Sequence, residues 1–145
     1  MTDYNLYRGS IFHCIEDGGN VKPVYFPDGL MVVSEGKIVE VGEYSELSVR
    51  FRSGDHIVHF KDSLIMPGFI DSHIHYPQYK VISSYGTSLL QWLNKYTFVE
   101  EQKFSDIDYA SRIAELFLDE LIKNGTTTAM TFCTSHKQSV EVFCS

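Results

Sequence analysis

Two strand-like segments that flank a long amphipathic helix constrain the fold of this chain more than any other feature. Residues 69–75 and 126–132 are short and rich in apolar or β-branched side chains, as buried strands are. The helix between them, residues 106–124, repeats apolar residues at helical spacing: Tyr109, Ile113, Leu116, Phe117 and Leu121. A strand, a helix and a strand in this order predict a βαβ unit with parallel strands.

Both ends of this helix carry the residues that usually start and stop helices. Ser105 is the expected N-cap, and Asp108 follows three residues later. Gly125 stands where a helix commonly ends in a left-handed residue. We therefore expect the helix to begin directly after Ser105 and its apolar stripe to pack in the core.

The first third of the chain is expected to form β-strands. Glu35-Gly36 lies between two apolar runs, as the turn of a two-residue hairpin does. A segment rich in Gly, Asn and Pro, residues 17–23, predicts a loop. The expected strands are 6–15, 30–34, 37–41 and 56–60, with a helical piece at 44–52 and a shorter helix at 88–96 whose apolar face carries Leu89, Trp92, Leu93 and Tyr96.

Composition excludes several classes of protein. With 43% hydrophobic and 14% aromatic residues, the 145-residue chain is too apolar for intrinsic disorder. It has 12 Lys and Arg against 19 Asp and Glu, a net charge of −7, which disfavours nucleic acid or an anionic membrane as a partner. The first residues lack the basic and apolar regions of a secretory signal. These features predict a cytoplasmic protein.

The cysteines indicate the same compartment. Cys14, Cys133 and Cys144 are odd in number and widely spaced, without a C-x-x-C pair. This pattern disfavours a disulfide framework, a zinc ribbon and a thioredoxin-type redox site. We expect three reduced, structural cysteines.

The candidate functional residues lie at the end of the first strand of the predicted βαβ unit. Asp71, His73 and His75 alternate along this strand, so their side chains project from one face. Two imidazoles about 7 Å apart along a strand can converge on one divalent ion. An isolated H-x-H is often accidental, but here a break at Pro77 follows at once and places Gln78 in a loop at the strand end. Catalytic residues of α/β barrels lie at such ends.

These residues carry a resemblance to a known superfamily. Residues 66–75, MPGFIDSHIH, resemble the first barrel strand of the amidohydrolase superfamily, and residues 36–42 resemble its N-terminal β segment. Within the superfamily, the resemblance is to the guanine deaminases and extends over residues 31–143. The similar segments are residues 73–78, 90–98 and 124–129. The sequence WLNKYTF, within the second of them, is the part most specific to guanine deaminases.

The resemblance implies an α/β fold, the start of an amidohydrolase-type TIM barrel preceded by a small N-terminal β-sandwich segment. Residues 1–66 would be the N-terminal part of the β domain, and residues 67–145 the first βαβ portion of the barrel. A complete barrel takes about 250 residues and eight strands. The chain would therefore be a truncated, N-terminal portion of such an enzyme, inactive alone.

The resemblance also implies roles for individual residues. His73 and His75 match the first two zinc ligands, and Gln78 matches a residue that hydrogen-bonds the purine. Trp92 is either a wall of the purine pocket or a core residue. Asp71 is expected to support the site rather than bind metal. His136 is expected in an exposed loop, with the pocket mouth as the alternative.

The implied reaction is the hydrolysis of guanine to xanthine and ammonia, a step of purine catabolism. Bound zinc lowers the pKa of water towards about 7, and a carboxylate moves protons to the departing amine. That Glu and the remaining metal ligands would lie downstream, so no catalytic residue is assigned within this chain. The H-x-E and P-C-x-x-C motifs of the other zinc deaminases do not occur.

Three alternatives remain open at this point. The first is an aminohydrolase of the same superfamily that acts on another heterocycle. The second is a non-catalytic fragment that self-associates, because two barrel strands leave sheet edges uncovered. A metal-free binding module is the third, although it leaves the two-histidine strand unexplained. The expected partner is a small-molecule purine, with a homo-oligomer possible.

Overall fold

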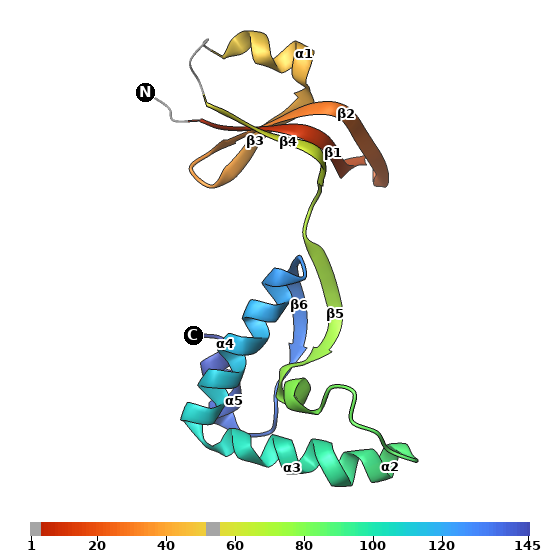
Figure 1. Ribbon diagram of the computed structural model, residues 1–145, viewed down its shortest axis with the longest axis vertical. Helices are drawn as coiled ribbons and strands as arrows, with labels where there is room; N and C mark the ends of the chain where they lie inside the picture. The colour runs from red at the N-terminus through yellow and green to blue at the C-terminus, as the bar shows by residue number, and fades with distance from the viewer. Residues whose placement is uncertain (1–3, 52–55) are drawn as a thin grey trace. The chain divides into compact units, whose positions relative to one another are not determined.

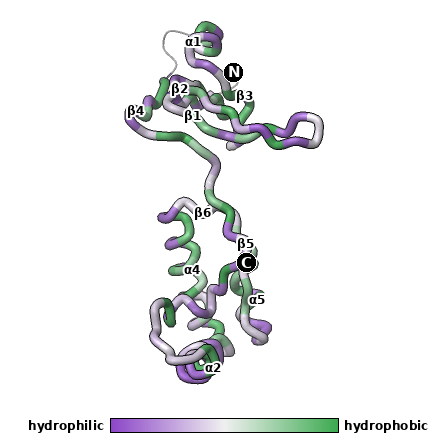
Figure 2. Tube along the Cα trace, turned by 90° about the vertical axis from the view of Figure 1, so that its right-hand side faces the viewer, coloured by the Kyte–Doolittle hydropathy of each residue, from purple (hydrophilic) through white to green (hydrophobic). Residues whose placement is uncertain are grey.

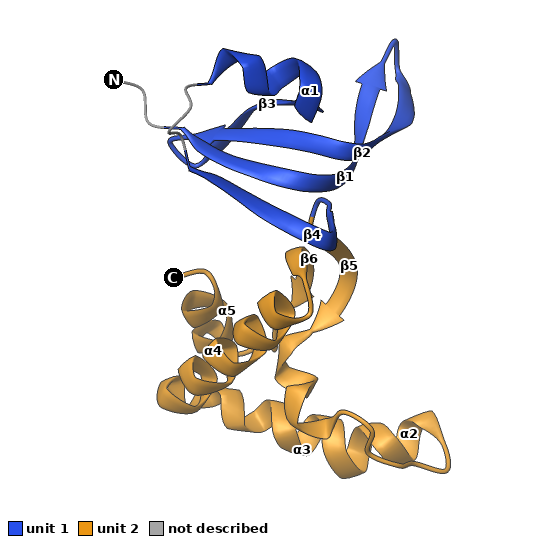
Figure 3. Ribbon diagram, turned by 45° about the horizontal axis from the view of Figure 1, so that its top comes forward, with its two compact units in different colours: residues 1–67 blue, residues 68–145 orange. Residues whose placement is uncertain are grey.

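The computed structural model describes residues 4–51 and 56–145 and divides the chain into two compact units, Met1–Pro67 and Gly68–Ser145 (Figure 3). Each unit has its own hydrophobic core, and Figure 2 shows hydrophobic residues in both units. Within the described ranges, no helix is long and apolar enough to cross a membrane.

Unit 1 is a four-stranded sheet with a short helical segment (Figure 1). The strands stand in the order β3-β2-β1-β4, in which β4 runs parallel to β1 and the other neighbours are antiparallel. Their bounds are β1 Asn5–Asp17, β2 Asn20–Ser34, β3 Lys37–Glu43 and β4 Ile57–Ile65. This is one sheet, so the two-sheet sandwich expected from the sequence stays a prediction.

The loop expected over residues 17–23 is wrong. Gly18 and Gly19, both with positive φ (60° and 83°), reverse the chain in two residues, and β2 begins at Asn20. Pro23 lies opposite Cys14 in the ladder; a proline is compatible with a strand where the ladder does not need its nitrogen as a donor.

The second hairpin of unit 1 is confirmed. Glu35 and Gly36 have φ of 51° and 74°, the paired positive values of a type I′ turn. After β3, the chain forms α1 Tyr44–Leu47 and a 3₁₀ turn Ser48–Arg50, while Arg52, the expected end of this piece, lies outside the described residues. The core beneath α1 consists of Leu6, Leu30, Val32 and Leu47.

Unit 2 contains the βαβ unit, as expected. Strands β5 Phe69–His75 and β6 Thr126–Phe132 pair in parallel, and helices connect them. The connection comprises η2 Tyr76–Val81, α2 Leu89–Trp92, the π-helical η3 Leu93–Thr97, α3 Phe98–Glu101, η4 Gln102–Ser105 and α4 Ile107–Lys123. A further helix, α5 Lys137–Phe143, follows β6.

The sequence placed the start of α4 one residue too early. Asp106, not Ser105, is the N-cap, because its carboxylate accepts hydrogen bonds from the backbone N–H groups of Asp108 and Tyr109 at 2.9 and 3.4 Å. The Ser105 hydroxyl instead donates to the carbonyl of Gln102 at 3.0 Å and belongs to the preceding 3₁₀ turn. Gly125 ends the helix with φ of 80°, as expected.

Two apolar positions are more exposed than the sequence predicted. Leu116 of the α4 stripe is 40% exposed, whereas Ile113 and Phe117 are buried. Leu89, the first residue of α2, is 73% exposed, and the expected 88–96 helix continues only as far as Trp92 before a π-helical turn replaces it. The core of unit 2 is Tyr76, Phe104, Ala110, Ile113, Ala114 and Phe117.

The cap assignment leads to a stability prediction. Asp106→Ala removes a carboxylate that satisfies two helix N–H groups, so we expect the free energy of unfolding to fall by about 1 kcal/mol. The matched variant Ser105→Ala removes the residue that the sequence suggested, and we expect a smaller change. Urea unfolding followed by circular dichroism measures both, and a larger loss in Ser105→Ala would contradict the assignment.

Candidate functional site

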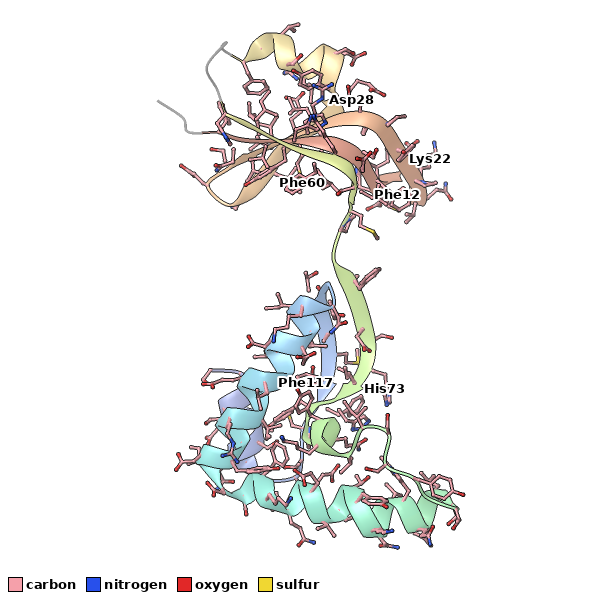
Figure 4. All side chains as sticks on the ribbon, viewed as in Figure 1. Phe12, Lys22, Asp28, Phe60, His73 and Phe117 are labelled. Carbon is pink, nitrogen blue, oxygen red and sulfur yellow. The ribbon has the colours of Figure 1, made fainter. Side chains whose placement is uncertain are left out.

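The two histidines of β5 come together at the carboxyl end of the strand. Their Nε2 atoms are 3.1 Å apart, and their ring centroids are 5.1 Å apart. His75 is half-buried and His73 is exposed, and Figure 4 shows His73 at the end of β5. The period-two geometry of the strand therefore places both imidazoles on one side, as expected.

This pair has a geometry suited to one divalent ion. Imidazole nitrogens bind zinc at about 2.0–2.1 Å, so two of them in a tetrahedral site lie about 3.3 Å from each other. The observed Nε2 separation of 3.1 Å is close to that value. Within residues 4–51 and 56–145, no group of three or more His, Cys, Asp and Glu side chains is placed to hold a metal.

A phenylalanine from the neighbouring strand supports both imidazoles. The Phe132 ring lies 4.8 Å from the His75 ring and nearly parallel to it, at 17°. Its centroid is 4.7 Å from that of His73. Because Phe132 is the last residue of β6, the parallel pairing of the strands brings it beside the histidines.

Asp71 supports the backbone of the strand. Its Oδ1 accepts a hydrogen bond from the backbone N–H of His73 at 3.0 Å. The register of β5 against β6 shifts between Asp71 and Ile74, so this carboxylate compensates for an irregular stretch of the ladder. This contact gives Asp71 a role in the local structure of the strand.

Beside the histidines lies an open pocket of about 360 Å³. Gln78 and Trp92 both line it, together with His73 and His75. The structure thus brings together the four residues that the resemblance links to the metal or to the purine pocket. His136 does not line this pocket; it is half-buried and precedes α5 as its N-cap residue.

Gln78 has a carboxylate partner that sequence reasoning missed. Its side-chain Nε2 donates to Oε1 of Glu101 at 3.4 Å, in a partly buried position. Glu101 ends α3, 23 residues later in the chain, so no local pattern connects the two residues. Phe132 was missed for the same reason, although the predicted parallel pairing of the strands contained the signal for it.

A buried carboxylate holds α3 against α4. Glu100, 6% exposed, accepts a hydrogen bond from the Tyr109 hydroxyl and pairs with Lys103 at 2.5 Å. Burial raises the pKa of Tyr109 to about 12, with a further contribution from the Glu100 hydrogen bond. These contacts fix the end of α3, from which Glu101 reaches Gln78.

The sequence profile described as the amidohydrolase family matches residues 64–143, more than half of the chain. The chain belongs to this family. The matched region begins just before β5 and contains the histidine pair, the pocket and the whole βαβ unit. The family assignment and the site geometry therefore rest on the same residues.

Within the amidohydrolase family, the chain is similar to guanine deaminases. The chain is 40% identical to guanine deaminase of Escherichia coli over 81% of its own length, and 37% identical to a probable guanine deaminase of Deinococcus radiodurans over 88%. These matches cover 27% and 30% of the two relatives. The chain thus spans about a third or less of the length of the proteins it resembles.

Solved structures of guanine deaminases are also similar to this chain. Guanine deaminase of Bradyrhizobium japonicum matches with a TM-score of 0.84 and 38% identity over 97% of this chain and 32% of that one. The enzyme of C. acetobutylicum, solved with guanine in its active site, matches with a TM-score of 0.79 and 35% identity over 98% of this chain and 33% of that one. The chain has the mixed α/β fold of this part of those amidohydrolases.

The environment of Tyr109 leads to a titration prediction. Because its folded pKa is raised to about 12 from about 10 in the unfolded chain, its contribution to stability is full below pH 10. That contribution is lost as the pH rises from 10 towards 12. Alkaline titration of phenolate absorbance should show a step near pH 12 that Tyr109→Phe removes and the exposed control Tyr85→Phe retains. A Tyr109→Phe protein that keeps the step would contradict this environment.

Proposed function

We propose that this chain forms the N-terminal part of a zinc-dependent guanine deaminase, which hydrolyses guanine to xanthine and ammonia in the cytoplasm as a step of purine catabolism. The observation that carries the proposal is the convergence of His73 and His75 at 3.1 Å beside a pocket that Gln78 lines. Sequence identity of 37–40% to guanine deaminases supports the choice of substrate.

The proposal includes the architecture of the whole enzyme. Unit 2 supplies the first two strands of a TIM barrel, and unit 1 contributes to a small β-sandwich domain. Active sites of such barrels lie at the carboxyl ends of the strands, which is where His75 and Phe132 end β5 and β6. The other barrel strands complete the metal site and contribute the proton-transferring Glu.

Each residue at the site then has a defined task. His73 and His75 hold the metal through Nε2, and Phe132 limits the rotation of both rings. When bound, zinc lowers the pKa of a water molecule, so that hydroxide is available near neutral pH. Gln78 hydrogen-bonds the purine edge, because an amide both donates and accepts. Trp92 forms a wall of the pocket against which a flat heterocycle packs.

A second candidate is a non-catalytic, self-associating chain. It is favoured by exposed apolar residues of unit 2, among them Ile70 of β5 at 75% and Leu89 at 73%. Sedimentation equilibrium distinguishes the two readings: concentration-dependent association without zinc binding favours the second candidate. A homo-oligomer that binds zinc through the histidines is compatible with the first.

Zinc binding by the 145-residue chain is the first test. Because each imidazole supplies one of two neighbouring ligands, His73→Ala and His75→Ala should each lower zinc affinity by at least about tenfold. Competition with a chromophoric chelator measures the affinity. His136→Ala is the matched control and should bind zinc like the parent. Equal affinities in all four proteins would contradict the assigned ligands.

Catalysis requires more of the barrel, so the second test completes it. The chain is joined to the portion of Escherichia coli guanine deaminase that follows the matched region. We expect this chimera to release xanthine and ammonia from guanine when zinc is present. Gln78→Ala should raise KM by about tenfold, as the loss of one hydrogen bond predicts.

A panel of amino-substituted heterocycles, including adenine, cytosine and guanine, is assayed with the same chimera. If the chimera turns over another heterocycle faster than guanine, that heterocycle is the substrate and the deaminase reaction is retained. A folded, zinc-loaded chimera without activity on any member would overturn the proposed function.

A further inference from the structure

Gln78 lies in the pocket with its amide group held by one neighbour. The side chain is partly buried, and its Nε2 donates to Glu101 Oε1 at 3.4 Å. A carboxylate only accepts hydrogen bonds, whereas an amide has a donating and an accepting end. Contact with a carboxylate therefore distinguishes the two ends of the Gln78 amide.

The partner itself is firmly placed. Glu101 is the last residue of α3 and follows Glu100, which is buried and bound to Tyr109 and Lys103. Gln78 lies in η2, directly after Tyr76 and Pro77, both buried. The hydrogen bond thus joins two anchored segments rather than two mobile ends.

We propose that Glu101 is a positioning residue that sets the orientation of the Gln78 amide. This inference rests on the proposed function, since it specifies how Gln78 meets the purine. With the amide nitrogen directed to Glu101, the carbonyl oxygen of Gln78 is presented to the ligand. The second N–H of the amide and its carbonyl oxygen then have fixed places, and the oxygen accepts from a ring edge that carries an N–H donor, which guanine has.

The orientation is tested in the 145-residue chain, without catalysis. In ¹⁵N-labelled protein, the side-chain amide protons of Gln78 are identified by their absence in Gln78→Ala. We expect Glu101→Ala to shift them towards the values of a solvated glutamine and to accelerate their exchange with water. Glu115→Ala, which removes an exposed carboxylate from α4, should leave them unchanged.

Binding is tested in the chimera with the completed barrel. Glu101→Ala should raise KM for guanine by about tenfold, the effect of losing one oriented hydrogen bond, with a much smaller change in kcat. Glu101→Gln keeps a carbonyl acceptor in the same place and should restore most of the affinity. A merely structural role would instead lower kcat and thermal stability in both variants and leave KM unchanged.

The outcomes separate the inference from the proposed function. Unchanged Gln78 amide signals in Glu101→Ala overturn the inference, whatever the chimera does. Shifted signals together with a raised KM support it. Shifted signals in the 145-residue chain, together with a chimera that never deaminates guanine, would retain Glu101 as the partner of Gln78 and reject the purine as the ligand.

Discussion

Burial of Tyr76 directly after the histidine strand is the interaction on which the site depends. Its side chain is fully buried, and its hydroxyl donates to the carbonyl and to Oγ of Ser139 at 2.7 and 3.0 Å. Its ring packs against Phe104 and Phe143. Because Tyr76 fixes the chain immediately after His75, the end of β5 is held in one position. The imidazoles of His73 and His75 are held in place with it.

The same anchor orders the other side of the pocket. Gln78 follows Tyr76 by two residues and meets Glu101, whose neighbour Glu100 is buried between α3 and α4. Aromatic packing, a buried carboxylate and the parallel strand pair thus converge on one small region. The Nε2 atoms of the histidine pair and the amide of Gln78 come from a single stretch of six residues, 73–78, in which Tyr76 is anchored to Ser139 and Gln78 to Glu101.

Local patterns predicted much of this arrangement. The period-two alternation of His73 and His75, the βαβ order and the Gly36 turn all follow from rules that act over a few residues, and the structure agrees with each. Contacts between distant residues were not predictable in this way. Glu101 and Phe132 reach the site only because α3 packs against η2 and β6 pairs with β5. The errors are local: Asp106 rather than Ser105 caps α4, and a π-helical turn at Leu93–Thr97 replaces the second half of the expected 88–96 helix.

The central claim is that His73 and His75 bind one metal ion together, and X-ray absorption at the zinc edge tests it most directly. The chain loaded with one equivalent of zinc should show imidazole nitrogen at about 2.0–2.1 Å, and this signal should weaken in His73→Ala and in His75→Ala. Sulfur scattering at about 2.3 Å would assign the metal to the free cysteines. That result, or a nitrogen signal unchanged by both substitutions, would contradict the account.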